Sequence, residues 1–455
     1  MFTAPLYQET HRPQFHFSPK RDWMNDPNGL VYYDGEYHLF FQHTPGSLRH
    51  GPNTWGHAVS RDLVRWHQIE HALEPDEMGY IWSGSAVVDT CNTAGFKTGA
   101  DSVLVAFYTV GDPRTQPEKP CTQCIAYSND RGRTWTKYAG NPVIGHIREY
   151  NRDPKVVWHA PTGQWIMALY LADNDYTLFH SPDLKVWTRL CDLVLPGVTE
   201  CPDLFELSVD GNPTDTRWVF WGGNGGYLVG RFDGKTFVAE TEVLAAERGP
   251  NGYAAQTWSD IPPEDGGRIQ ISWMHGGKFP SMPFTHQMSF PVELTLKTVA
   301  EGIRLCREPV REIETLYTKT DQWTDVAIHP GADLIPQTEA ELFDVRLEFE
   351  APTATSVGVE IRGLVLTYNV AGETVTFKER SATLKAEKGR VALRLLIDRT
   401  SLEVFGANGE LSMSFCFLPE AADHPFRFFA TGGQACLVSL TINELRSAWE
   451  DQWDK

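Results

Sequence analysis

The stretch Ser60-Arg61-Asp62-Leu63-Val64-Arg65-Trp66 recurs along this chain in a degenerate form. Later stretches share its acidic turn and its aromatic end, and they lie at Ser128–Trp135, Ser181–Trp187 and, more loosely, Phe232–Phe237. The four begin at residues 60, 128, 181 and 232, a spacing of 51 to 68 residues. Such a period is typical of four-stranded propeller blades, each closed by an Asp-containing turn. The alternative is a chance recurrence of Ser, Asp and Trp in a β-rich chain.

Around these turns the sequence predicts strands and almost no helix. Residues 31–33 and 36–41 are apolar or aromatic and flank Asp34-Gly35, which is a strong hairpin turn signal. Further strands are predicted at Val103–Thr109, Trp165–Leu171, Trp218–Trp221 and Ile269–Trp273. The predicted fold class is therefore all-β, and about 290 residues at the observed period correspond to roughly five blades.

The texture of the sequence changes near residues 304–320. Arg307–Ile313 is predicted to be a polar connector, and the alternating segments Val345–Phe349 and Val391–Ile397 beyond it are typical of a β-sandwich. We therefore expect a five-bladed β-propeller catalytic domain at residues 1–305, a connector at 306–320 and a C-terminal β-sandwich at 321–455.

Charge and hydropathy exclude several classes of partner. The 455 residues carry a formal net charge of −19, which repels nucleic acid and anionic membranes. No apolar run approaches the roughly 20 residues needed to span a bilayer. The first residues lack a signal-peptide pattern, and mostly reduced thiols favour the cytoplasm, although removal of a signal segment would mean secretion. The oligomeric state stays open.

The cysteine pattern predicts no metal site. Cys121-Thr122-Gln123-Cys124 is the only C-x-x-C, and it precedes a predicted strand. A zinc site is the alternative, but no second pair has the spacing that zinc requires. We expect ordinary strand cysteines here, and neither a metal nor a cofactor in the protein.

Three separated acids stand out as candidate catalytic residues: Asp26 in Trp23–Gly29, Asp153 in Asn151–Pro154, and Glu200 in Thr199–Asp203. Each is surrounded by turn-forming residues, which hold a side chain at the end of a strand. Acids among polar and aromatic residues suit cleavage of a sugar bond, because one acid attacks while another protonates the leaving oxygen. For a single Asp in a turn, a capping role is the alternative.

Ordered motifs in this chain resemble glycoside hydrolase family 32, which contains invertases, levanases and exo-inulinases. The resemblance covers residues 15–296, and a weaker one covers residues 397–405. The motifs that carry it are WMNDPNG (23–29), FQ (41–42), WGH (55–57), WSGSAV (82–87), RDP (152–154), ECPDLF (200–205) and YAAQTW (253–258). This family likeness implies a five-bladed propeller followed by a sandwich.

The resemblance also implies roles for individual residues. Asp26 corresponds to the nucleophile, Glu200 to the acid/base, and Asp153 to the residue that stabilises the transition state. Residues expected to bind or enclose the sugar are Asn25, Gln42, Trp55, Trp82, Ser83, Arg152, Tyr253 and Trp273. The chain departs from the family at residues 284–290, where an aromatic-Arg pair is replaced, so the leaving-group side is expected to differ.

The implied activity is that of a retaining β-fructofuranosidase, which removes terminal β-D-fructofuranosyl units from sucrose, fructo-oligosaccharides, inulin or levan in exo mode. Its partner would be a neutral fructose-containing saccharide. The alternatives are a fructosyltransferase, a non-catalytic fructan-binding propeller and a related arabinan-type hydrolase, because fold alone does not fix function. The sequence leaves linkage preference and chain-length preference open.

Overall fold

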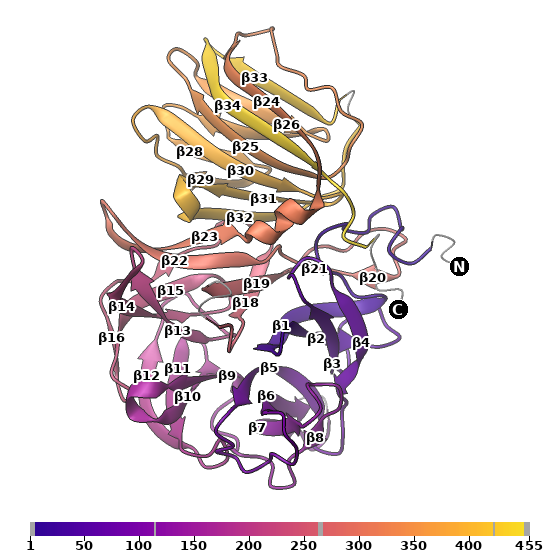
Figure 1. The fold of residues 1–455 in the computed structure, drawn as a ribbon, viewed down its shortest axis with the longest axis vertical. Coiled ribbons are helices and arrows are strands. Elements are labelled where there is room, and N and C mark those ends of the chain that lie inside the picture. Colours follow the sequence, from indigo (N-terminus) through magenta and orange to yellow (C-terminus); the bar gives the residue numbers. More distant parts are fainter. Residues whose placement is uncertain (1–4, 113–114, 263–266, 422–423, 450–455) are drawn as a thin grey trace.

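The structure is a computed structural model that describes residues 5–112, 115–262, 267–421 and 424–449. Its regular elements are strands, joined by turns and by the short 3-10 helices η1 (Ala160–Thr162), η3 (Arg311–Leu316) and η4 (Ala407–Gly409). The all-β prediction is confirmed. In Figure 1 the propeller strands (indigo to magenta) and the sandwich strands (orange to yellow) form two bodies, with β22, β23 and η3 between them. Among the described residues, no helix has the length and apolar character to cross a bilayer.

The propeller is built from antiparallel sheets whose strands follow one another in the chain. The first sheet has the order β20-β1-β2-β3-β4, with β1 Asp22–Tyr33, β2 Glu36–Thr44, β3 Thr54–Ser60, β4 His67–Leu73 and β20 Phe284–Thr285. The second has the order β5-β6-β7-β8, with β5 Tyr80–Asp89, β6 Val103–Asp112, β7 Lys119–Ser128 and β8 Thr136–Lys137. The third has the order β12-β11-β10-β9, with β9 Arg152–His159, β10 Gln164–Ala172, β11 Asp175–Ser181 and β12 Thr188–Val194.

The remaining propeller strands form one ten-stranded sheet along the path β16-β15-β14-β13-β22-β19-β18, with β17, β21 and β23 as side branches. Their bounds are β13 Asp203–Val209, β14 Asn212–Trp221, β15 Gly226–Phe232, β16 Phe237–Ala239, β17 Leu244–Ala245, β18 Gly252–Thr257, β19 Arg268–Met274, β21 Gln287–Met288, β22 Val292–Val299 and β23 Gly302–Pro309. Strand β1 contacts β5 and β18, while β9 contacts β5 and β13, so these strands surround a common axis. Because one sheet spans two of the expected units, the count of five blades stays a prediction.

The recurring turns predicted from the sequence are structural repeats. In the first, the Asp62 carboxylate accepts the backbone N–H groups of Val64 and Arg65, and the Trp66 indole N–H donates to the Leu63 carbonyl. The turns around Asp130 and Asp183 repeat the same pattern with Trp135 and Trp187. The turn at Asp233 keeps the Asp contacts. Each turn joins the third and fourth strands of a sheet, which confirms the predicted repeat.

The predicted strands are also confirmed. The Asp34-Gly35 turn connects β1 to β2, and both turn residues have positive φ, 51° and 82°, as a type I′ hairpin requires. The four later predictions fall within β6, β10, β14 and β19. Cys121 and Cys124 lie on β7, where both thiols are buried.

The C-terminal body is a sandwich of two antiparallel sheets. One has the order β24-β34-β25-β30-β31-β32 and the other β29-β28-β27-β26-β33. Their bounds are β24 Tyr317–Ile328, β25 Phe343–Glu350, β26 Ser356–Ile361, β27 Leu364–Asn369, β28 Thr374–Phe377, β29 Arg380–Thr383, β30 Arg390–Ile397, β31 Ser401–Gly406, β32 Leu411–Cys416, β33 Phe426–Thr431 and β34 Ala435–Leu445. Between the bodies, β23 continues to Pro309 and η3 follows it; the domain boundaries at 305/306 and 320/321 stay a prediction.

Apolar packing joins the propeller to the sandwich. Leu396 and Phe405 of the sandwich belong to the same buried cluster as Phe290 and Val292 of the propeller. At 25 cal/mol per Å², burial of each such side chain contributes about 2 kcal/mol. The sandwich therefore covers one side of the propeller.

A buried histidine adds a charged contact to this interface. The His16 ring lies between two sandwich carboxylates, with Nδ1 2.8 Å from Asp398 Oδ2 and Nε2 2.7 Å from Glu403 Oε2. Asp398 also accepts the backbone N–H groups of Gln14 and Phe15. Burial acts to lower the pKa of His16, but the hydrogen bonds and charges of Asp398 and Glu403 outweigh it and raise the pKa to about 9. His16 is therefore a cation at neutral pH.

This contact predicts a pH-dependent stability. A raised histidine pKa stabilises the fold fully below the unfolded pKa of about 6.5, and that stabilisation is lost as the pH rises through about 9. We expect the free energy of unfolding of the wild type to fall by on the order of a few kcal/mol over this window. His16→Gln should remove this slope, while the exposed-site control His329→Gln should keep it. Urea titrations between pH 6 and 10 measure both, and an unchanged slope in His16→Gln would contradict the assignment.

Candidate active site

The three acids converge at one end of the propeller axis, on the strands nearest to it. Asp26 lies in β1, Asp153 is the second residue of β9, and Glu200 lies three residues before β13. A single guanidinium, that of Arg152, contacts both Asp153 and Glu200. Residues up to 174 positions apart thus form one site.

Local breaks in strand pairing point these side chains at the axis. The pairing register shifts between Met24 and Pro27 in β1, and between Ile81 and Gly84 in β5. It shifts again opposite the start of β9, and after Tyr253 in β18. A bulge bends its strand and changes the direction of a side chain. The site residues Asn25, Asp26, Trp82, Ser83 and Asp153 all lie within such breaks.

Asp26 is held by two side-chain donors. The Ser83 hydroxyl donates to Oδ2 at 2.6 Å, and the Asn25 amide donates to Oδ1 at 3.1 Å. Burial raises the pKa of Asp26, and the nearby charge of Glu200 adds to the rise, whereas the two hydrogen bonds and Arg152 oppose it. These two hydrogen bonds fix the orientation of the Asp26 carboxylate, which lines the hollow between the three acids.

Asp153 is the most deeply buried of the three acids, with 4% of its surface exposed. Its Oδ2 accepts the backbone N–H of Cys201 at 3.0 Å and lies 3.7 Å from the Arg152 Nε. Burial raises the pKa of Asp153 to about 7; Arg152 opposes the rise, and the charges of Asp26 and Glu200 strengthen it. Asp153 therefore holds a proton more readily than an exposed aspartate does.

Both carboxylate oxygens of Glu200 accept a hydrogen bond. Arg152 donates to Oε1, and the Tyr253 hydroxyl donates to Oε2 at 2.6 Å. Glu200 and the following Cys201 have φ of 59° and 39°, in the left-handed region that non-glycine residues seldom adopt. Strained backbone of this kind recurs at functional sites, where the surrounding structure enforces it.

A hollow of about 220 Å³ lies among these groups. Of the residues predicted to bind or enclose a sugar, seven line it together with the three acids: Asn25, Gln42, Trp82, Ser83, Arg152, Tyr253 and Trp273. Two of them keep polar atoms without partners among the described residues, the side-chain carbonyl of Gln42 and the indole N–H of Trp273. Buried polar atoms are normally paired, but these two have almost no accessible surface and lie inside the wall of the hollow.

Trp55 differs from the prediction, because it does not line the hollow. It is 0% exposed and packs in a core cluster with Phe40. Its indole N–H donates to the carbonyl of Trp82 at 3.0 Å. Trp55 therefore supports the wall that Trp82 forms.

Two lining residues were absent from the sequence prediction. His50 and Asn53 come from the loop between β2 and β3, and the Asn53 amide lies 3.1 Å from the His50 Nε2. The Trp23 ring packs edge-on against His50, with centroids 5.8 Å apart. No periodicity or motif distinguishes this loop, so the sequence offered no signal for it beyond its position next to Gln42.

The region that departs from the family pattern also reaches the site. His286 has φ of 69°, and its Nδ1 lies 2.7 Å from the carbonyl oxygen of Met24. Its ring packs edge-on against Trp23 and Trp273, with centroids 4.6 and 5.1 Å away. A histidine therefore supports the two tryptophans beside the hollow.

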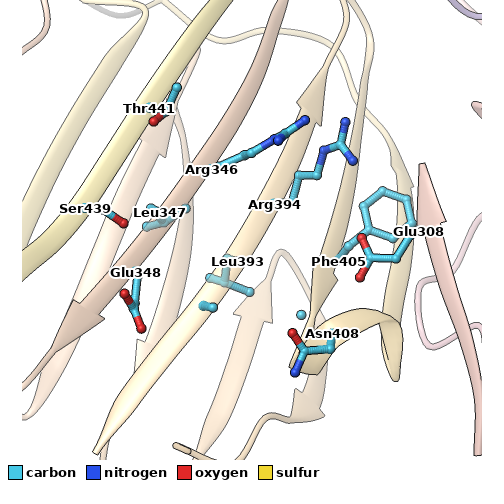
Figure 2. Close-up of a pocket in the computed structure, with 12 residues that line it drawn as sticks. Glu308, Arg346, Leu347, Glu348, Leu393, Arg394, Phe405, Asn408, Ser439 and Thr441 are labelled. Atoms are coloured by element: carbon cyan, nitrogen blue, oxygen red, sulfur yellow. The ribbon is translucent and has the colours of Figure 1, made fainter. Parts of the chain in front are cut away.

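A larger hollow, of about 500 Å³, lies on the sandwich between Glu308, Arg346, Glu348 and Arg394 (Figure 2). Its guanidinium groups are already paired with protein carboxylates, since Arg394 donates to Asp344 and Arg346 contacts Glu314. It contains none of the three acids. Within the described residues, no group of three or more His, Cys, Asp and Glu side chains could hold a metal ion.

Comparison with known proteins assigns the family. The profile of the glycosyl hydrolases family 32 N-terminal domain matches residues 16–309, and that of the family 32 C-terminal region matches residues 312–444. The chain belongs to glycosyl hydrolase family 32. As a family 32 enzyme it is a glycoside hydrolase, and the family resemblance inferred from the motifs is confirmed.

Relatives of known name extend over the whole chain. A levanase from Bacillus subtilis is 40% identical over 98% of this chain and 72% of its own length. A levanase from Bacillus sp. (strain L7) is 34% identical, and the chain spans about half (53%) of its length. The crystal structure of an exo-inulinase from Aspergillus awamori superposes with a TM-score of 0.89 at 30% identity, covering 97% of this chain and 100% of that one.

The raised pKa of Asp153 predicts that this residue costs the family 32 enzyme stability. A carboxylate with a raised folded pKa favours unfolding once the pH exceeds its unfolded pKa, so the cost grows between about 4 and 7. Asp153→Asn should therefore raise the free energy of unfolding at pH 7.5, by on the order of a few kcal/mol, with no gain below pH 4.

The matched control for this prediction has the opposite sign. Burial acts to raise the pKa of Asp183, but the N–H groups of Val186 and Lys185 hold it below its ordinary value. Asp183→Asn should therefore destabilise at pH 7.5. Denaturant titrations at both pH values measure the two variants, and a loss of stability in Asp153→Asn would contradict the burial argument.

Proposed function

We propose that this enzyme is a retaining β-fructofuranosidase that removes terminal fructosyl units from sucrose, fructo-oligosaccharides or fructans. The observation that supports it best is the convergence of Asp26, Asp153 and Glu200 on one small hollow. The names of its relatives give the substrate class. They include levanases, exo-inulinases and a fructofuranosidase from Schwanniomyces occidentalis complexed with fructosylnystose, whose structure is 27% identical with a TM-score of 0.88.

In the first step, an oxygen of Asp26 forms a bond to the anomeric carbon of the terminal fructose. The bond from that carbon to the leaving oxygen breaks, and Glu200 transfers a proton to this oxygen. Ser83 and Asn25 orient Asp26 for the attack through the hydrogen bonds described above. Positive charge develops on the ring, and an ionised carboxylate at Asp153 stabilises it.

In the second step, water replaces the leaving group. Glu200 accepts a proton from the water as its oxygen bonds to the anomeric carbon, and the bond to Asp26 breaks to release fructose. Arg152 and Tyr253, which hold the two Glu200 oxygens, keep this carboxylate directed at the same place in both steps. No metal or cofactor takes part in this scheme.

The size of the hollow supports exo cleavage. At about 220 Å³ it is smaller than the roughly 300–1,000 Å³ of pockets that enclose drug-sized ligands. Trp82 and Trp273 are part of its wall. A hollow of this kind accepts a chain end and excludes the middle of a chain.

The mechanism predicts a severe loss of activity when either reacting acid is removed. Asp26→Ala and Glu200→Ala should each lower kcat on sucrose by at least about a thousandfold, because each loses a whole chemical step. Asp130→Asn, at a turn remote from the hollow, is the control and should keep its activity. Steady-state kinetics, with circular dichroism to check folding, test this, and wild-type turnover in either alanine variant would refute the assignment.

Exo cleavage predicts the order of products. Free fructose should be the first product released from inulin and from levan, before any oligosaccharide accumulates. Time-resolved anion-exchange chromatography measures this. Oligosaccharides as the early products would reveal an open cleft, and longer saccharides formed at high sucrose in place of free fructose would favour the fructosyltransferase alternative.

A further inference from the structure

A buried ion pair lies a few residues after two of the acids in the chain, at β9 and at the start of β13. The Lys155 Nζ is 3.4 Å from the Asp203 Oδ2, and the two side chains are 1% and 0% exposed. Lys155 follows Asp153 by two residues along β9. Asp203 follows Glu200 by three residues and begins β13.

The pair meets a third strand through both backbone groups of one residue. The Thr257 N–H donates to the Asp203 Oδ2 at 2.6 Å, and the Thr257 carbonyl accepts from the Lys155 Nζ at 2.6 Å. Thr257 ends β18, the strand that carries Tyr253. Side chains thus tie together β9, β13 and β18.

No backbone ladder joins these three strands. Strand β9 is the edge of a four-stranded sheet, while β13 and β18 are separated by β22 and β19 within the ten-stranded sheet. Backbone hydrogen bonds through Gly223 link Glu200 to Ala254, which follows Tyr253. The spacing between Arg152 and Glu200 depends instead on contacts that side chains make. The Lys155–Asp203–Thr257 junction is such a contact, and its members lie three or four residues from Arg152, Glu200 and Tyr253.

A contribution to the stability of the fold is a weak explanation for the buried Lys155–Asp203 pair. Burying two charges costs desolvation that their attraction seldom exceeds, and apolar side chains of similar volume are often at least as stable. Burial lowers the pKa of Lys155 even though Asp203 opposes the shift. The geometry that the pair imposes explains its presence better than a gain in stability does.

We propose that Lys155 and Asp203 are positioning residues, which set the spacing between Arg152 on β9 and Glu200 before β13. This inference rests on the proposed function, because it concerns the geometry of the same acids. Lys155 and Asp203 touch no substrate; they act through the strands.

The decisive test separates position from stability. Lys155→Met leaves Asp203 buried without its cation, so it should lower both the thermal midpoint and kcat. The double variant Lys155→Met/Asp203→Leu removes both charges and should recover part of the thermal midpoint, because Thr257 still loses both of its partners. If the pair sets the geometry, kcat on sucrose should stay ten- to a hundredfold below the wild type while KM changes less than threefold. Recovery of wild-type kcat together with stability would overturn the proposal.

Two further variants complete the design. Arg394, which Figure 2 shows beside the sandwich hollow, forms an ion pair with Asp344. Arg394→Met removes the cation of this pair, and it should lower the thermal midpoint with kcat unchanged. Asp203→Asn keeps the side-chain shape and an acceptor for the Thr257 N–H, so it replaces the double variant in the test if that variant does not fold. It should lower kcat, and a wild-type kcat would overturn the proposal.

A crystal structure of the double variant gives a readout independent of activity. The contact between Arg152 and Glu200 should be lengthened or lost, and an unchanged contact would overturn the proposal. Failure of the proposed function is recognised differently, by an Asp26→Ala or Glu200→Ala variant that keeps its activity.

Discussion

One guanidinium among three clustered carboxylates is the constraint on which this site depends. Arg152 contacts Asp153 and Glu200 directly, and its charge also acts on Asp26. Three acids that lie this close together are not readily all ionised without a cation, since like charges and burial both favour the protonated form. The raised pKa of Asp153, about 7, is the remaining cost of this arrangement.

Near the propeller axis the strands are irregular, and these irregularities bring the charged groups together. Bulges in β1 and β5, and positive φ at Asp153, Glu200 and Cys201, point polar groups inward. Each irregularity costs stability, and the surrounding sheets, the repeated Asp turns and the apolar contact with the sandwich offset that cost. The stable sheets therefore hold in place a site whose strained backbone and clustered charges are unfavourable. Such a trade-off is usual where stability and activity compete.

Much of this structure was predictable from local sequence. The hairpin at Asp34-Gly35, the recurring Asp turns and the alternating sandwich strands follow from short-range patterns, and the motifs identified all three acids. The prediction failed for residues whose position depends on contacts between distant parts of the chain. Trp55 and Trp82 look alike in the sequence. Only packing shows that Trp55 is fully buried, whereas Trp82 is half-buried and lines the hollow. His50 and Asn53 come from an unpatterned loop, and the bulges that aim Asn25 and Ser83 depend on pairing with distant strands.

Trapping the reaction half-way is the most direct test of the account. A Glu200→Ala variant given a fructoside whose leaving group needs no proton should complete the first step and stall at the second. Peptide mass spectrometry after rapid acid quenching should then find one fructosyl unit bound to the peptide that contains Asp26. An adduct on Asp153, or no adduct while the leaving group is released with an inverted product, would contradict the account.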